Sequence, residues 1–252
     1  MVKEILIKPI DAKSAKVIVE KYHYSGKSTQ NSQVHFGVFL HGKLEGALQF
    51  GPSIDKRRMS ANLGIGFNEF LELNRMAFSD RLPKFSESRA IGVCLRILKK
   101  TYPHLRVILS FADACQCGDG TIYRASGFKL HSYKKNNSLL LDEDGNVEFN
   151  HGTKKRPTVV AKKSLDNKIG DNGRVLSSIK KLKPIPGFQM KYLYFFDKEL
   201  EKKFKFVDFK DIPDEVRMYK GIRRVEHEIN ASPDQGEESG VIPTNALQSI
   251  ES

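Results

Sequence analysis

The stretch Phe67–Asp113, FNEFLELNRMAFSDRLPKFSESRAIGVCLRILKKTYPHLRVILSFAD, contains three consecutive elements of regular structure. Residues 67–78 form an extended run, residues 87–102 carry apolar side chains at spacings of three and four, and residues 107–112 are almost entirely apolar. The middle pattern is typical of an amphipathic helix, and the last is typical of a strand covered on both faces. This order predicts a βαβ unit with parallel strands, and therefore an α/β protein.

Polar residues mark both ends of the predicted helix. Ser86 is placed to cap its N-terminus, Lys99 and Lys100 suit the negative end of its dipole, and Pro103 ends it. Free backbone N–H groups at a helix start bind anions, and the hydroxyls of Ser86 and Ser88 add two donors. This helix start is predicted to bind a phosphate or pyrophosphate. Plain capping, the alternative, accounts for Ser86 alone.

Elements on both sides of this unit extend the predicted sheet. We expect a first helix over 13–21, a hairpin of strands 34–40 and 44–50, a short helix over 118–126, a strand from 128 and a strand over 187–196. An antiparallel hairpin that leads into a β-α-β-α-β core is the order of elements in the N-acetyltransferase-like (GNAT) fold. The predicted fold class is therefore α/β, with a mixed central sheet flanked by helices.

The charge is strongly positive and unevenly distributed. The chain has 42 Lys and Arg against 30 Asp and Glu, a net charge of +12. Residues 225–252 hold six of the acidic residues and no Lys or Arg, so residues 1–224 carry 42 basic against 24 acidic side chains, or +18. We expect a catalytic domain over 1–224 with a flexible basic arm at 151–184, and an acidic disordered tail over 225–252. The excess charge predicts double-stranded DNA as a partner, with a basic surface tuned for solubility as the alternative.

No segment of the sequence is predicted to enter a membrane. No run reaches the about 18 apolar residues that a membrane span requires, and the N-terminus lacks the apolar core of a secretory signal. Three cysteines, Cys94, Cys115 and Cys117, are an odd number, and the last two are separated by a single residue. We therefore expect reduced thiols rather than disulfides or a zinc site. These features predict a protein that acts in the cytoplasm.

Several polar side chains stand in or next to the apolar strands. Glu72 and Arg75 lie inside one strand, where burial without partners is costly, so they are predicted to form a structural ion pair or to serve a site. Asp113 ends the next strand, at the edge where α/β proteins bind ligands, and we expect it to meet Arg75 and the helix start there. A turn-capping role for Asp113 is the alternative. Tyr123 is predicted to exchange a proton at the same mouth, or to be a core aromatic.

The segment Tyr22-His23-Tyr24 follows the first predicted helix and places a histidine between two aromatic residues. A histidine in this setting can serve as a base, a metal ligand or a support for a stacked nucleobase, or it can be purely structural. The sequence leaves these roles open.

Seven motifs, taken in order, resemble those of the bacteriophage Mom family of DNA-modification proteins. The resemblance spans about residues 20–222 and is specific because the motifs occur as an ordered series. The motifs are His23-Tyr24-Ser25-Gly26, Leu48-Gln49-Phe50-Gly51-Pro52, Glu72-Leu73-Asn74-Arg75-Met76, Ser86-Glu87-Ser88-Arg89, Ser110-Phe111-Ala112-Asp113, the run from Gly118 to Phe128, and Lys191-Tyr192-Leu193-Tyr194-Phe195.

The resemblance implies a GNAT-like fold and an enzyme that converts adenine in duplex DNA to N6-(methylcarbamoyl)adenine, which protects phage DNA from host restriction. The host cytoplasm is the implied place of action. The catalytic positions of the family fall on His23, Tyr24, Arg75, Asp113 and Tyr123. The helix-start serine of the family falls on Ser88, and with Ser86 from the helix-start argument the predicted cofactor-binding residues are Arg75, Ser86 and Ser88.

The resemblance also implies acetyl-CoA as the cofactor, but Ser86 and Ser88 stand where ordinary GNAT enzymes have glycines. Direct acetyl transfer to N6 gives an N-acetyl group, whereas the modification contains an additional nitrogen. An activated glycyl ester such as glycyl-tRNA supplies the required atoms and is the alternative donor. A redox route with iron held near His23 is the rival mechanism.

An adenine must leave the duplex before its N6 can react, and Tyr22, Tyr24 or Phe85 is predicted to hold the displaced base. Two other functions remain open at this point. One is a conventional GNAT N-acetyltransferase that acts on a protein or a small-molecule amine. The other is a non-catalytic DNA-binding protein.

Overall fold

The structure is a computed structural model that describes residues 5–115, 118–137, 139–141, 147–149, 183–213, 218–219 and 222–223. Cys117 and the expected acidic tail at 225–252 lie outside the described residues. The expected basic arm at 151–184 also lies outside them, except for its last two residues.

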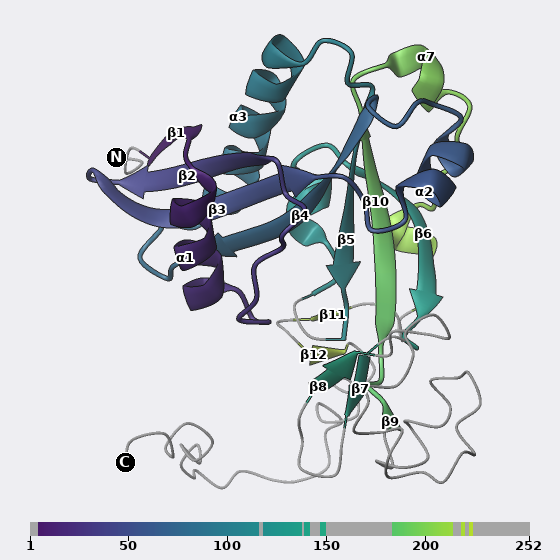
Figure 1. Ribbon diagram of the computed structural model, residues 1–252. Coiled ribbons are helices and arrows are strands. Elements are labelled where there is room, and N and C mark those ends of the chain that lie inside the picture. The colour runs from purple at the N-terminus through teal and green to yellow at the C-terminus, as the bar shows by residue number, and fades with distance from the viewer. Residues whose placement is uncertain are drawn as a thin grey trace, which may run out of the picture.

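A seven-stranded mixed sheet forms the centre of the molecule, in the order β1-β2-β3-β4-β5-β10-β6 (Figure 1). Only β4 and β5 run parallel among these neighbours, and the other pairs are antiparallel. The strands are β1 Ile5–Pro9, β2 Val34–Leu40, β3 Lys43–Gly51, β4 Phe70–Phe78, β5 Val107–Asp113, β6 Lys129–Lys135 and β10 Phe188–Phe195. The predicted α/β class with a mixed sheet is confirmed.

Helices cover both faces of the sheet. On one face, α1 (Ala12–Tyr22) packs on Ala47 and Ala77, and α2 (Lys56–Leu63) packs on β5 and β10. On the other face, α3 (Ser86–Thr101) covers the largest apolar cluster, beside the short α4 (Thr121–Ala125). We call these the α1/α2 face and the α3/α4 face.

Shorter elements complete the described part. They are α7 (Lys198–Glu201), the 3-10 turn η2 (Phe209–Asp211), a small sheet of β7 (Leu139–Leu141), β8 (Val147–Phe149) and β9 (Lys183–Pro184), and the pair β11 (Met218–Tyr219) and β12 (Ile222–Arg223).

Most predicted elements are present, and one prediction at the start of α3 needs a correction. In the central sheet and the helices that cover it, strand β1 and helix α2 were not predicted, and neither were the shorter elements outside that sheet. The prediction that Ser86 caps α3 is wrong: the capping position belongs to Phe85, which has a φ of 68° and makes no side-chain cap. Ser86 is instead buried in the first turn, where its hydroxyl donates to the carbonyl of Pro83 at 2.6 Å.

Strands β4 and β5 are paired only at one end. Phe70, Leu71 and Glu72 are in register with Val107, Ile108 and Leu109, and beyond these three pairs the two strands separate. The parallel βαβ unit is therefore confirmed, but its strands form a splayed pair rather than a full ladder.

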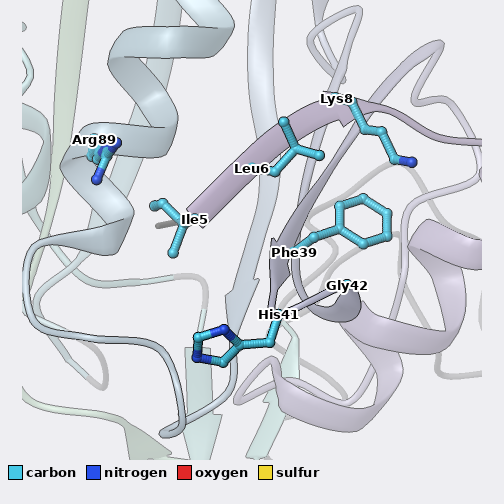
Figure 2. A pocket seen from close by; sticks show the side chains of 7 residues that line it. All are labelled: Ile5, Leu6, Lys8, Phe39, His41, Gly42 and Arg89. Carbon is cyan, nitrogen blue, oxygen red and sulfur yellow. The ribbon is translucent and has the colours of Figure 1, made fainter. Parts of the chain in front are cut away.

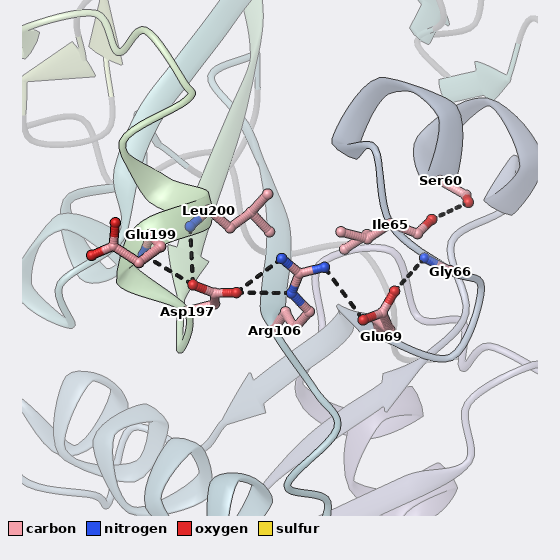
Figure 3. A network of polar contacts seen from close by, with 8 residues as sticks. All are labelled: Ser60, Ile65, Gly66, Glu69, Arg106, Asp197, Glu199 and Leu200. Atoms are coloured by element: carbon pink, nitrogen blue, oxygen red, sulfur yellow. Dashed lines mark hydrogen bonds and ion pairs between the residues drawn. The ribbon is translucent and has the colours of Figure 1, made fainter.

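The paired end is fastened by Arg106 (Figure 3). Its Nη1 lies 3.4 Å from a carboxylate oxygen of Glu69, and its Nε and Nη2 each lie 2.9 Å from Oδ2 of Asp197. The other oxygen of Asp197 accepts from two backbone N–H groups at the start of α7, each at 2.9 Å. One guanidinium thus joins the start of β4, the start of β5 and the end of β10.

Candidate active site

A β-bulge in β4 sets the direction of Arg75. Leu73 is in register with Phe50 and Arg75 with Gln49, so Asn74 is the extra residue. Such a bulge reverses which face the following side chains occupy, and Arg75 therefore projects on the α1/α2 face. Its Nε donates to the carbonyl of Lys27 at 3.0 Å and its Nη1 to that of Asn74 at 2.7 Å.

His23 follows α1 and lies beside Arg75. Burial, and then the positive charge of Arg75, lower the pKa of His23 from 6.5 to about 4. Its Nδ1 lies 2.8 Å from the hydroxyl of Ser25 and accepts from the backbone N–H of that residue at 3.1 Å. The exposed ring of Tyr24 stacks on the imidazole at a centroid distance of 4.3 Å. The structure thus brings His23, Tyr24 and Arg75 together around a neutral imidazole.

Asp113 ends β5 on the same face, because it alternates with Val107 and Leu109, which pack against α2. One carboxylate oxygen accepts from the backbone N–H of Cys115 at 3.1 Å. Burial raises the pKa of Asp113 above 3.8, although the bonds from Cys115 oppose that change. Asp113 is therefore a partly desolvated carboxylate and a stronger base than a solvated one.

Glu72 is a second partly buried carboxylate on the α1/α2 face. Burial raises its pKa, while hydrogen bonds with Ser53 and Asn74 and the charge of Arg75 oppose that shift. Glu72 was predicted to need polar partners because its burial alone would be costly. Ser53 and Asn74 are its hydrogen-bond partners, and the nearby positive charge of Arg75 favours its ionised form.

The start of α3 lies on the opposite face, next to a cavity of about 460 Å³. The cavity is lined by Lys84, Arg89 and both serines, and by Ala125 of α4. The hydroxyl of Ser88 donates to the carbonyl of Phe85 at 3.3 Å. In the described part of the chain, the backbone N–H groups of Glu87 and Ser88 meet no backbone acceptor. These donors, with the two cations, fit a phosphate or pyrophosphate group.

Tyr123 lies on α4, the helix that also borders this cavity. Its ring packs between Phe128 and Tyr192, at centroid distances of 5.7 and 5.6 Å. The hydroxyl of Tyr192 donates to the carbonyl of Asp119 at 2.5 Å and accepts from Arg124 at 2.7 Å. Burial, the first cause, raises the pKa of Tyr192 to about 12. This buried bond network fixes α4 and hence the position of Tyr123.

The predicted residues thus fall into two groups. His23, Tyr24, Arg75 and Asp113 lie on the α1/α2 face. The two serines and Tyr123 belong to the elements of the α3/α4 face. The single mouth expected from the sequence is therefore divided between the two faces of the sheet, and the strands that carry Arg75 and Asp113 are paired with each other at only three positions.

Two residues of the α1/α2 face were missed. Phe111 is exposed in the middle of β5, and Lys191 lies opposite it on β10. A signal was present for Lys191, because it is the one charged residue in the largely apolar and aromatic run 188–196.

A second cavity, of about 550 Å³, lies at the β1 edge of the sheet (Figure 2). It is lined by residues of β1, by Phe39, by the hairpin turn at His41 and by Arg89. The ammonium group of Lys8 lies over the ring of Phe39 at 4.6 Å from its centroid. Of the residues predicted to form the site, none lines this cavity.

Two further expectations concern metals and membranes. Within the described ranges, no three His, Cys, Asp or Glu side chains are grouped so that they could hold a metal ion. None of the helices in the described part of the chain combines the length and the apolar character that a bilayer span requires. Cys94 is buried, and burial raises the pKa of its thiol.

Comparison with known proteins agrees with the motifs. Residues 4–213 match the Mom protein family. The chain is 31% identical over 217 residues to "Methylcarbamoylase mom" of Escherichia phage Mu, and the match covers 84% of this chain and 83% of the phage protein.

Solved structures with a similar arrangement are acetyltransferases. The ribosomal-protein-S18-alanine N-acetyltransferase from Escherichia coli is 9% identical, with 83% of this chain and 99% of that chain covered and a TM-score of 0.42. An IAA acetyltransferase from Bacillus cereus is 10% identical, with 77% of this chain and 100% of that chain covered and a TM-score of 0.39. These similarities are too weak to bear on activity.

Proposed function

Because this chain belongs to the Mom protein family, we propose that it is a transferase that converts adenine in duplex DNA to N6-(methylcarbamoyl)adenine. The observation that carries the proposal is the grouping of His23, Tyr24 and Arg75 on the same sheet face as the partly desolvated Asp113. The net charge of +12 supports a nucleic-acid substrate. The modification would protect phage DNA from restriction in the host cytoplasm.

The reaction requires an adenine that has left the helix, because its N6 is otherwise paired and stacked. Tyr24 is 55% exposed and stacked on His23, which suits an aromatic that stacks on one of the two faces of the displaced base. Asp113 would remove a proton from N6 as that nitrogen attacks the donor. Arg75, which carries a fixed charge on the same face, would stabilise the negative charge that develops on the donor carbonyl.

The phosphate end of the donor would be held at the start of α3, and its reactive carbonyl would have to reach Asp113 and Arg75 on the other face through the place where β4 and β5 are no longer paired. Ser88, Lys84 and Arg89 fit a phosphate at this helix start, which suits the pyrophosphate of acetyl-CoA as well as the phosphates of a tRNA end. Bound acetyl-CoA would supply an activated acyl thioester. An acetyl group alone lacks the second nitrogen of the product, so we favour an activated glycyl ester such as glycyl-tRNA.

The atoms balance for a glycyl donor. N6 attacks the ester carbonyl, the bond from that carbonyl to the tRNA oxygen breaks, and the tRNA hydroxyl leaves with a proton that Tyr123 would donate. The glycyl amine then attacks C6 through a five-membered ring, and the original C6–N6 bond breaks. The product carries N–CH2–CO–NH2 at C6, with the first N6 as the amide nitrogen and without any net oxidation.

The test is expression of the full chain with a plasmid, digestion of the plasmid to nucleosides and mass spectrometry of the adenosines. The expected result is a modified deoxyadenosine, and glycine labelled with nitrogen-15 and carbon-13 should label the added group. Acetylated protein without any modified deoxyadenosine would instead identify a conventional N-acetyltransferase. A modified but unlabelled nucleoside would exclude the glycyl donor while leaving DNA modification in place.

A further inference from the structure

An aromatic side chain lies uncovered in the middle of the sheet. Phe111 is on β5, the fifth of seven strands, and 45% of its surface is exposed. Its neighbours Ser110 and Ala112, which point to the α3/α4 face, are buried. On the same face of β5, Val107 and Leu109 are buried against Met59 and Leu63 of α2, so this cover ends before Phe111 and leaves its ring accessible to a ligand.

A lysine stands directly opposite this ring. Lys191 on β10 is in register with Phe111, and its Nζ lies 3.9 Å from the sulfur of Met59 on α2. Burial, and then the charge of Arg58, lower the pKa of Lys191. Among the described residues, Lys191 forms no ion pair. A half-buried cation without a carboxylate partner is costly unless an anion from outside completes it.

The helix next to Lys191 adds more positive charge. The first turn of α2 is Lys56-Arg57-Arg58, and all three side chains are exposed. Asp55 caps this helix by accepting from the backbone N–H of Arg58 at 3.2 Å. The open aromatic ring is thus bordered by a run of cations on the side of α2.

Phe111 is also close to the proposed base. Asp113 is two residues further along β5 and on the same face, which corresponds to about 7 Å along a strand. A purine stacked on the ring of Phe111 would therefore present its edge to the carboxylate of Asp113.

We propose that Phe111, Lys191 and the first turn of α2 form the docking floor for the target DNA strand, with Phe111 stacking on the displaced adenine and Lys191 binding a phosphate beside it. This inference rests on the proposed function and assigns its DNA substrate to the α1/α2 face. The chemistry fits, because a nucleotide presents a flat base next to a negative charge, as the floor presents a flat ring next to a positive one.

Two kinds of variant test the floor in the full-length protein. Phe111→Leu removes the aromatic ring but keeps an apolar side chain, and Phe111→Trp restores a ring. Lys191→Met removes the charge at nearly constant length. Phe39→Leu and Lys100→Met are matched controls away from the floor. Thermal unfolding first checks that each variant is folded.

Affinity is then measured by fluorescence anisotropy for two short duplexes, one fully paired and one with an adenine opposite an abasic site. Phe111→Leu should weaken binding of the second duplex by roughly tenfold, with a smaller effect on the paired duplex and with binding restored in Phe111→Trp. Lys191→Met should weaken both duplexes alike and reduce the slope of log affinity against log salt by about one. The two controls should bind as the unmodified protein does.

Unchanged affinity and salt dependence in folded Phe111→Leu and Lys191→Met would overturn the docking floor. Weakened binding of bulk tRNA with unchanged binding of DNA would also overturn it, because the surface would then serve an RNA. Failure of the proposed function has a different signature. The unmodified protein would then leave plasmid deoxyadenosine unaltered, whatever the binding curves of the variants.

Discussion

Arg75 donates a hydrogen bond of 3.0 Å from its Nε to the main-chain carbonyl of Lys27. This bond connects strand β4 to the loop after α1. Its second bond, to the carbonyl of Asn74, uses Nη1. A lysine has a single ammonium and cannot hold both carbonyls in this geometry. We expect Arg75→Lys to increase amide hydrogen exchange in residues 24–28 and to lower DNA modification at least about tenfold. Unchanged exchange in this loop would contradict the anchoring role.

His23 should make stability depend on pH. Its pKa is lowered to about 4 by burial first and Arg75 second, so between pH 6.5 and about 4 the unfolded chain binds a proton that the folded chain does not. Stability should therefore fall as the pH falls through this window, by at most about 3 kcal/mol and by less where solvent screens the site. The check is urea unfolding at several pH values, with His23→Leu as the variant that should flatten the curve. An NMR titration of His23 near pH 6.5 would refute it.

The ionised carboxylate of Asp113 should lower the stability of the protein while being required for its activity. Burial raises its folded pKa above the unfolded value, so the stabilisation it gives when protonated is present at low pH and lost as the pH rises through the folded pKa. Asp113→Asn removes the cost of the charge at neutral pH and keeps an oxygen for the N–H of Cys115. We expect a higher melting temperature at pH 7 and at least about a 100-fold loss of DNA modification. A variant that melts earlier would show that the ionised carboxylate is stabilising.

Replacing Ser86 should affect the stability of the protein, whereas replacing Ser88 should affect binding of the donor. Ser86 is buried and bonded to Pro83, so Ser86→Ala should lower the free energy of unfolding by about 1 kcal/mol. Ser88 lines the cavity and bonds only weakly to Phe85, so Ser88→Ala should leave stability unchanged and raise the KM for the donor. Denaturant unfolding and donor titration separate these effects, and the reverse pattern would move the anion site away from Ser88.

The hydroxyl of Tyr192 should stabilise the protein through α4. Tyr192→Phe leaves the carbonyl of Asp119 and one donor of Arg124 without this partner, at a cost of about 1–3 kcal/mol. Gly120→Ala should be worse, because a Cβ there would lie 2.3 Å from the Tyr192 ring and Gly120 has a φ of +81°. Urea unfolding measures both, and equal stability of Tyr192→Phe would show that the bonds contribute nothing net.

The elements that could be predicted were those whose own side chains decide their structure. The periodicity of α3 and the apolar run of β5 reflect local burial, and both were located from sequence within a few residues. Helix α2 was missed because only Met59 and Leu63 of its eight residues are buried, so its sequence resembles a charged loop. The strand over 188–195 was predicted, but its place between β5 and β6 depends on long-range pairing, for which no local pattern exists.

The sequence could predict which residues form the site, but not how they are arranged in space. A charged residue in an apolar strand indicates a role for Arg75, but the bulge at Asn74 that sets its direction depends on the register with β3. The expected cap at Ser86 failed because the positive φ of Phe85 turns the chain into the helix one residue earlier. The exposure of Phe111 depends on how far α2 covers strand β5, which no pattern around Phe111 encodes.

The short pairing between β4 and β5 divides the central sheet into two blocks that are hydrogen-bonded to each other only at one end. One block is the antiparallel set from β1 to β4, and the other is β5, β10 and β6. Arg106 links the two blocks at their paired end through its ion pairs with Glu69 and Asp197 (Figure 3). Arg75 lies on β4 in the first block, and Asp113 lies on β5 in the second. The distance between these two side chains therefore depends on three residue pairs, on the ion pairs of Arg106 and on the apolar cluster that both blocks share.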